Sequence, residues 1–218
     1  MIKKIYAWLY KATARSDERG ESFGGYVQGA VRAKTLETLG APSGKVLEIG
    51  SGSGLFLMKL AIQNPALEAY GVDTADGLVE QVKEKARARG IANLQLSCQS
   101  GAKVSFADGY FDIVVCINLF LDMNKDGVIA VLKEMKRVCK PSGRIIFEFR
   151  NARNALFRLK YRLARYYDPS APYPLYTYYP EDIDRILDEL GLAVVLKEYM
   201  GFPIKRFAPI IIVEVRKR

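Results

Sequence analysis

The chain has 218 residues, of which half are hydrophobic, and it carries a formal net charge of +9. This composition suits a folded domain with a sizeable core and argues against intrinsic disorder. The sequence contains no histidine, which excludes a Ser-His-Asp triad, a Cys-His dyad and most transition-metal sites, so we expect no metal. No apolar run reaches the roughly 18 residues that span a bilayer. Because the N-terminus also lacks a signal-peptide pattern, we expect a cytoplasmic protein without a transmembrane segment.

The three cysteines, Cys98, Cys116 and Cys139, are widely spaced and stand in apolar surroundings. Such spacing argues against a disulfide framework and against a zinc site. We therefore expect buried free thiols.

Residues 1–43 precede the first expected strand, and we expect them to form an N-terminal helical cap. Hydrophobic residues recur at helical spacing within residues 2–10, which predicts a short amphipathic helix. Residues 15–25 are polar and glycine-rich, as expected for a loop. Residues 26–39 predict a second helix, which the Gly-Ala-Pro-Ser-Gly stretch after it ends.

The rest of the chain, residues 44–218, predicts one doubly wound α/β domain. Up to residue 149 strands and helices alternate, which is the pattern of a parallel sheet with both faces covered, and beyond it the alternation lapses. The last two strands are joined by Gly201-Phe202-Pro203, a link too short for a helical crossover, so they should be antiparallel neighbours. The strands are expected at 46–49, 67–73, 94–98, 111–117, 144–149, 192–199 and 209–215, and the helices at 55–61, 76–89, 126–139 and 180–190.

The stretch from Val46 to Gly54, VLEIGSGSG, joins a short buried strand to glycines at alternate positions: Gly50, Gly52 and Gly54. With the helix that follows, it forms the first unit of a nucleotide-binding sheet. Glycine has no Cβ atom, so these positions tolerate positive φ and let a ligand lie against bare backbone. The helix N-terminus behind them offers unpaired N–H groups to a polar or anionic group.

Further motifs accompany this glycine turn. Glu48 lies two residues before the first glycine, and Asp73 ends the second strand. The stretches FDIVVCINLFLDM and LKEMKRVCKPSGRIIFEF follow at the fourth strand and at the helix and strand after it. With these motifs, residues 44–150 resemble the small-molecule branch of the class I S-adenosylmethionine-dependent methyltransferases. The resemblance implies a seven-stranded Rossmann-like methyltransferase fold with an antiparallel last strand, S-adenosyl-L-methionine as cofactor, and methyl transfer by in-line SN2 displacement.

The resemblance also implies a cofactor site. Glu48 would hold the ammonium group, backbone N–H groups near Gly50 and Gly52 would meet the carboxylate, and Asp73 would accept hydrogen bonds from both ribose hydroxyls. Asp73 could instead cap the next helix, a role that Asp76 could fill equally well. The full set of implied cofactor-binding residues is Glu48, Gly50, Ser51, Gly52, Asp73, Thr74, Gln99, Ser100, Asn118 and Leu119.

At the adenine side and the acceptor side of this site, the sequence follows the family pattern less closely. Ser100 stands where many relatives have an aspartate for the adenine amino group, and Gln99 is an alternative acceptor. Asn118 and Leu119 are expected to face the transferred methyl. A general base is needed only for an acceptor that must lose a proton, such as a hydroxyl. The sequence singles out none of the candidates, which are Asp17, Glu18, Asp122, Glu148 and the tyrosines.

Residues 150–180 are expected to form a lid insertion. Residues 150–167 are expected to be helical, because an apolar stripe at helical spacing runs through them. Residues 150–165 include six basic residues and no acidic one. A proline- and tyrosine-rich segment follows. Three interpretations are open: a lid helix packed by its stripe, a site for an anionic or phosphorylated substrate, or an RNA or membrane surface. The stripe comprises Ala152, Leu156, Leu159, Leu163 and Tyr166.

These motifs predict an enzyme, an S-adenosylmethionine-dependent methyltransferase for a small-molecule acceptor, with an anionic acceptor among the options. An RNA methyltransferase is the alternative enzyme. A non-catalytic, cofactor-binding regulatory protein is the alternative outside catalysis. Intact Glu48, the glycines and Asp73 favour cofactor binding in each case, but binding alone does not establish turnover.

Overall fold

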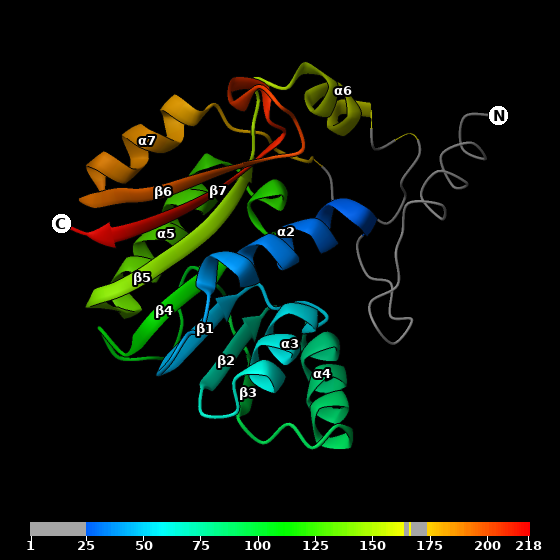
Figure 1. The fold of residues 1–218 in the computed structure, drawn as a ribbon, viewed down its shortest axis with the longest axis vertical. Helices are drawn as coiled ribbons and strands as arrows, with labels where there is room; N and C mark the ends of the chain where they lie inside the picture. The colour runs from blue at the N-terminus through cyan, green and yellow to red at the C-terminus, as the bar shows by residue number, and fades with distance from the viewer. Residues whose placement is uncertain (1–24, 164–165, 167–173) are drawn as a thin grey trace.

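The computed structural model describes residues 25–163, residue 166 and residues 174–218, and it arranges seven strands in one sheet. The strand order across the sheet is β3-β2-β1-β4-β5-β7-β6 (Figure 1). The predicted helix at residues 2–10 and nearly all of the predicted loop after it lie outside the described residues. The strands are β1 (Lys45–Ile49), β2 (Glu68–Asp73), β3 (Leu94–Cys98), β4 (Phe111–Cys116), β5 (Cys139–Arg150), β6 (Leu192–Met200) and β7 (Ile210–Lys217).

The pairing directions confirm the predicted mostly parallel sheet with an antiparallel last strand. Neighbouring strands from β3 to β5 are parallel, whereas β7 is antiparallel to both β5 and β6. The chain winds outward in both directions from the middle of the sheet, where β1 pairs with β2 on one side and β4 on the other. Ligands bind beyond the carboxyl ends of the strands at such a switch point. The topology therefore places the candidate site just after β1 and β4.

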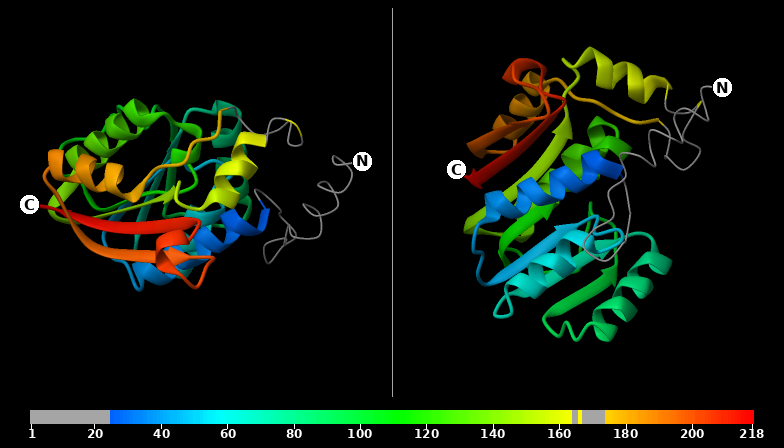
Figure 2. Two further views of the ribbon diagram at one scale, coloured as in Figure 1. Left: turned by 90° about the horizontal axis from the view of Figure 1, so that it is seen from above. Right: turned by 45° about the vertical axis from the view of Figure 1, so that its right-hand side comes forward.

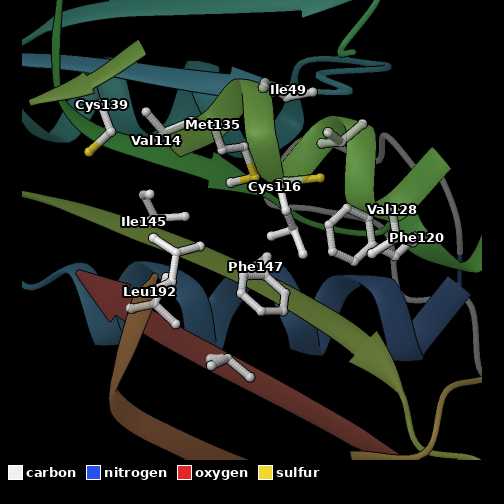
Figure 3. Close-up of a cluster of buried hydrophobic side chains, with 14 of the residues drawn as sticks. Ile49, Val114, Cys116, Phe120, Val128, Met135, Cys139, Ile145, Phe147 and Leu192 are labelled. Atoms are coloured by element: carbon white, nitrogen blue, oxygen red, sulfur yellow. The ribbon is translucent and has the colours of Figure 1, made fainter. Parts of the chain in front are cut away.

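Helices cover both faces of the sheet, and the alternation of side chains along each strand separates two cores. One core combines residues of α2 (Gly25–Leu39) and α3 (Leu55–Gln63) with Ile146. The other combines α5 (Lys125–Val138) and α7 (Pro180–Glu189) with Phe147 (Figures 2 and 3). α4 (Asp76–Ala88) packs against β2 and β3. Because Ile146, Glu148 and Arg150 alternate with Phe147 along β5, they face the α2 side.

The start and the end of β5 differ from the prediction. The strand begins at Cys139 rather than Arg144, and its register with β4 shifts across the stretch that contains Pro141 and Gly143. At the other end Arg150 belongs to the strand, and α6 (Ala155–Leu163) begins only at Ala155. The prediction of a helix starting at Arg150 is therefore wrong, because that residue continues the pairing with β7.

The segment after α6 is tied to the carboxyl end of β5. Tyr178 forms an isolated parallel bridge with Asn151, and its backbone N–H donates to Arg150 O at 2.8 Å. The N–H of Tyr176 donates to Leu121 O at 2.7 Å, and this oxygen belongs to the short helix η1 (Phe120–Asp122) after β4. The tyrosine-rich segment therefore lies beside the ends of both β4 and β5.

Two of the three cysteines behave as predicted. Cys116 and Cys139 are buried free thiols, but Cys98 is exposed. The prediction of a buried thiol is wrong for Cys98 because it ends β3, an edge strand that has a neighbour on one side only. Among the described residues, we find no helix with the length and apolar character needed to cross a membrane.

Candidate functional site

The glycine turn between β1 and α3 has the left-handed backbone expected from its sequence. Gly50, Gly52 and Gly54 have φ values of 78°, 48° and 71°. A Cβ atom on Gly50 would lie 2.9 Å from Leu119 Cδ2, and one on Gly54 would lie 2.3 Å from Val82 Cγ1, so these two positions are packed against neighbours. A Cβ on Gly52 would meet no atom of the described residues within 4 Å. Gly52 is therefore the glycine that presents bare backbone to open space.

The N–H groups of the turn are largely used inside the protein. Those of Gly50 and Ser51 donate to Val72 O at 2.8 and 3.0 Å, and that of Gly52 donates to Asp73 Oδ2 at 2.8 Å. These bonds join the end of β1 to the end of β2. The N–H groups that we expected to meet the cofactor carboxylate thus already donate to protein acceptors. The predicted contact would require each N–H to be shared between its protein acceptor and the carboxylate.

Asp73 organises the same region through both carboxylate oxygens. Oδ2 accepts from Gly52, and Oδ1 accepts from the N–H of Ala75 at 2.9 Å. Ala75 is the N-cap residue of α4, and neither Asp73 nor Asp76 caps that helix in the usual way. Each carboxylate oxygen can accept a further hydrogen bond. Asp73 therefore keeps acceptor capacity for hydroxyl donors, while its neighbour Thr74 is exposed.

Glu48 is the most unusual group of the site. Its side chain is buried near the end of β1, and its Oε2 atom has no hydrogen-bond partner among the residues that the structure describes. Burial raises the pKa of Glu48 well above its usual range, and Asp73 raises this pKa further, whereas the nearby guanidinium of Arg32 on α2 opposes the shift. An unsatisfied buried acceptor costs free energy. This carboxylate therefore favours a cationic or hydrogen-donating ligand.

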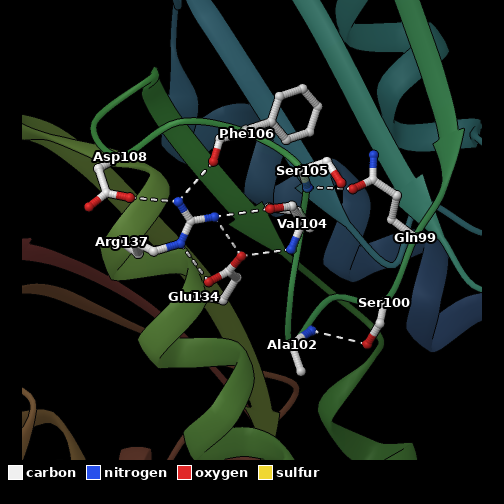
Figure 4. Close-up of polar contacts among 9 residues, drawn as sticks. All are labelled: Gln99, Ser100, Ala102, Val104, Ser105, Phe106, Asp108, Glu134 and Arg137. Carbon is white, nitrogen blue, oxygen red and sulfur yellow. Dashed lines mark hydrogen bonds and ion pairs between the residues drawn. The ribbon is translucent and has the colours of Figure 1, made fainter.

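Gln99 and Ser100 lie where the resemblance places the adenine side, but both make internal contacts (Figure 4). Gln99 donates through Nε2 to Ser97 Oγ at 2.7 Å and accepts through Oε1 from the N–H of Ser105 at 2.6 Å. Ser100 Oγ accepts from the N–H of Ala102 at a longer 3.4 Å. The Gln99 carboxamide therefore mainly holds its own loop, and Ser100 is the freer of the two.

An ion-pair network anchors the far end of this loop. Glu134 on α5 accepts from the N–H of Val104 at 2.6 Å and from Arg137 at 2.7 Å (Figure 4). Arg137 also donates to Asp108 Oδ1 at 2.6 Å. These contacts fix residues 104–108 on α5, so the loop reaches the site with a defined path.

Asn118 and Leu119 lie after β4, where the sequence predicts the methyl-transfer side. Leu119 packs against Gly50, which brings the end of β4 onto the glycine turn. Asn118 has a φ of 57°, a left-handed conformation that is uncommon for a residue with a side chain. Its N–H donates to Glu148 Oε1 at 2.8 Å, and its Oδ1 accepts from Arg150 at 3.0 Å. These bonds hold the unusual backbone in place.

The candidate bases separate clearly by environment. Asp17 and Glu18 lie outside the described residues. Glu148 is buried and paired with Arg150, so it serves the structure rather than proton transfer. Asp122 is exposed at the rim, and partial desolvation by the surrounding protein raises its pKa to about 6, against the attraction of Arg150. Among the tyrosines, Tyr178 donates its hydroxyl to Met123 O, and burial raises its pKa.

Sequence comparisons agree with this geometry. A family profile described as a methyltransferase domain matches residues 46–143. The ubiquinone/menaquinone biosynthesis C-methyltransferase UbiE of Geotalea daltonii is 33% identical over 130 residues, which cover 56% of this chain and 52% of that protein. The protein of the same name from Burkholderia mallei is 28% identical over 151 residues, covering 67% and 60%. Residues 46–143 therefore form a methyltransferase domain, and the chain is similar to class I S-adenosylmethionine-dependent methyltransferases.

Solved structures share this methyltransferase fold. The PH0226 protein of Pyrococcus horikoshii matches with a TM-score of 0.72 and 22% identity, over 98% of this chain and 99% of its own. The magnesium protoporphyrin IX methyltransferase of Synechocystis PCC 6803, solved with bound SAH, matches with a TM-score of 0.69 and 18% identity over the whole of both chains. The match to UbiE of Geotalea daltonii covers a smaller share of the relative, since this chain spans about half of that protein's length.

Sequence reasoning missed two features of this methyltransferase site. Arg150 was counted among the basic residues of a solvated helix, but it is buried against Glu148. The two residues are two positions apart, and in a strand this spacing places both side chains on one face of the sheet, which could have indicated the pair. Tyr161 on α6 accepts from Arg150 Nε at 2.9 Å. No local pattern marks that contact, because it depends on how α6 folds back over β5.

Proposed function

We propose that this chain catalyses S-adenosylmethionine-dependent methyl transfer to a small-molecule acceptor. The observation that carries the proposal is the buried Glu48 carboxylate at the end of β1, whose Oε2 lacks a partner within the described part of the chain. An ammonium group donates hydrogen bonds and carries the complementary charge. Gly52, with open space beside its backbone, and Asp73, with acceptor capacity left, follow directly along the same edge of the sheet. The residues present therefore fit the cofactor.

Each residue has a distinct part in this proposal. Glu48 would hold the ammonium group of the cofactor, and Asp73 would accept from the ribose hydroxyls. S-adenosylmethionine supplies an already activated methyl group, so the protein mainly provides proximity and orientation. Asn118 and Leu119, fixed against β5 and against Gly50, would line the side from which the acceptor approaches in line with the bond that breaks.

The small-molecule assignment is supported by the relatives and by the engagement of the basic side chains. The UbiE relatives are named for ubiquinone and menaquinone biosynthesis and the Synechocystis enzyme for magnesium protoporphyrin IX, all of which are small molecules. Arg150 is buried, Arg153 pairs with Glu181, and Arg158 donates to Ala152 O and to the Tyr179 hydroxyl. These internal contacts leave fewer cations for an RNA or an anionic acceptor than the sequence suggests.

Two measurements test the proposal. Calorimetry should show that the wild type binds S-adenosylmethionine and that Asp73→Ala abolishes this binding. Asp76→Ala changes an exposed neighbour and should bind as the wild type does. Equal affinity in the two variants would refute the ribose assignment. A cell extract supplied with methyl-labelled cofactor should then yield a labelled metabolite. Label found only in tRNA would favour the RNA alternative, and binding without any transfer would favour the regulatory one.

A further inference from the structure

The apolar stripe of α6 faces outward. Leu156, Leu159 and Leu163 follow helical spacing, and their exposed fractions lie between 42% and 76%. The opposite side of the helix is the attached one, because Tyr161 there reaches buried Arg150 and its ring lies 5.7 Å from that of Phe157. α6 is therefore held by its aromatic side, and the leucines, which in one of the three interpretations pack the helix down, are exposed.

A second group of exposed apolar side chains lies on the link between β6 and β7, which contacts the residue just before α6. Phe202, Ile204 and Phe207 are between 42% and 56% exposed. Asn154, just before α6, contacts this link, since its Nδ2 donates to Phe207 O at 2.7 Å, and Figure 1 shows the link next to the start of α6. We call the six residues Leu156, Leu159, Leu163, Phe202, Ile204 and Phe207 the apolar end surface.

The charges around the apolar end surface are basic. Lys160 and Arg162 flank the leucine stripe on α6, and Lys205 and Arg206 stand within the link. Neither α6 nor residues 201–208 contain an acidic residue. Glu181, which is nearby, is already paired with Arg153. The surface thus combines exposed aliphatic and aromatic side chains with cations on two adjacent elements.

Soluble monomers rarely gather large apolar side chains on one exposed surface without a partner. An anionic bilayer fits this combination, because its headgroups attract the cations while leucine, isoleucine and phenylalanine enter the acyl boundary. An RNA surface would use the cations but would leave the leucines and the isoleucine in water. We propose that the apolar end surface docks this protein on an anionic lipid bilayer.

The rigid attachment of α6 gives the docking a structural consequence. The Tyr161–Arg150 contact connects the inner side of the helix to the network that holds Asn118 after β4. A bilayer bound to the outer side would therefore lie against the lid of the candidate site. The docking itself rests on the exposed residues alone, so it can be tested without cofactor or acceptor and can fail independently of the proposed methyl transfer.

Vesicle flotation with the full-length protein tests the proposal. Vesicles of phosphatidylcholine with about one quarter phosphatidylglycerol should bind the protein, pure phosphatidylcholine should bind it much less, and added salt should weaken binding. The double variant Leu156→Ser/Leu159→Ser should weaken binding at least about tenfold, and Lys205→Glu/Arg206→Glu should do the same. Because all four side chains are exposed, we expect the variants to fold, which circular dichroism and thermal unfolding check.

Matched controls distinguish binding through the apolar end surface from nonspecific binding of the protein to vesicles. Ile62→Ser removes an equally exposed aliphatic side chain on α3, and Arg87→Glu/Lys103→Glu makes the same change in net charge elsewhere. Both should float as the wild type does. Absence of flotation on anionic vesicles, or equal losses in the controls, would overturn the proposal. Salt-sensitive binding to tRNA that depends on Lys205 and Arg206 but not on the leucines, together with no flotation, would assign the surface to RNA instead.

Discussion

Arg150 Nη1 lies 2.6 Å from Glu148 Oε2, and both side chains are 1% exposed. Both members of the pair also form hydrogen bonds to neighbouring residues. Glu148 accepts from the N–H of Asn118, and Arg150 donates to Asn118 Oδ1 and to the Tyr161 hydroxyl. A left-handed non-glycine backbone persists only where its surroundings hold it. The ion pair therefore supports the conformation of Asn118 at the end of β4 and connects it to α6.

Arg150→Met should destabilise the protein strongly, because it leaves the Glu148 carboxylate buried without its partner. Removing one member of such a pair costs about 3–5 kcal/mol. Urea unfolding at pH 7 measures the change. As a matched control, Lys83→Met breaks the exposed Lys83–Glu80 pair and should cost less than about 1 kcal/mol. Similar small losses in both variants would show that the buried pair is not a strong constraint.

The pH dependence of the same variant gives a second check. Burial raises the pKa of Glu148 above its usual range, while Arg150 opposes the shift, so removing Arg150 should raise this pKa further. A carboxyl with a raised folded-state pKa loses stability as the pH rises through that pKa. The deficit of Arg150→Met relative to wild type should therefore be larger at pH 8 than at pH 5. The double variant Glu148→Gln/Arg150→Met, which keeps an acceptor for Asn118, should recover much of the stability with little pH dependence.

Glu48→Gln should separate stability from cofactor binding. Burial raises the pKa of Glu48, so in the cofactor-free protein its stability contribution is full below the unfolded pKa and is lost as the pH rises through the folded one. The variant should therefore be more stable than wild type at pH 8, by at least about 1 kcal/mol, and this advantage should shrink at low pH. Its affinity for S-adenosylmethionine should fall at least about tenfold. Exposed Glu84→Gln should change neither quantity, and an unaltered affinity in Glu48→Gln would refute the ammonium assignment.

Gly52→Ala tests the open side of the glycine turn. Alanine at a positive φ should cost about 1–2 kcal/mol, but the added methyl meets no atom within 4 Å in the part of the chain that the structure describes. If the cofactor lies against this backbone, the added methyl should clash with it. The affinity of Gly52→Ala for the cofactor should then fall by far more than its loss of folding stability accounts for. Gly90→Ala is the matched control, since Gly90 also has positive φ and open space but follows α4 away from the site. It should show the same stability loss with normal binding, and indistinguishable binding in the two variants would place the cofactor elsewhere.

Local motifs predicted the fold and the framework of the site because they encode backbone geometry directly. The glycine turn at Gly50, the acid at Asp73 and the short link before β7 each fix a turn, an acceptor or a strand direction within a few residues. The packing between distant elements was not predictable in this way. The spacing of the α6 leucines identifies a stripe, but only the Tyr161–Arg150 contact determines which side of the helix faces the protein. The limits of the lid at residues 150–180 and of the cap at residues 1–43 stay predictions.

Asp122 gives the most direct test of acid–base chemistry at this site. It ends η1 and is exposed, while its two chain neighbours are held by the segment after α6, since Tyr176 N–H donates to Leu121 O and the Tyr178 hydroxyl donates to Met123 O. With a pKa raised to about 6, the carboxylate is ionised at neutral pH and can accept a proton from an acceptor that must lose one.

The activity should therefore follow the ionisation of Asp122. For the labelled acceptor found in extract, kcat/KM should decline below about pH 6, because protonation removes the base. Asp122→Asn should lower kcat about 10²-fold or more and remove this decline, with the KM for the cofactor unchanged. Asp126→Asn, an exposed aspartate in the first turn of α5, should leave both the rate and the pH profile intact. A normal rate and profile in Asp122→Asn would mean that the acceptor reacts without a protein base.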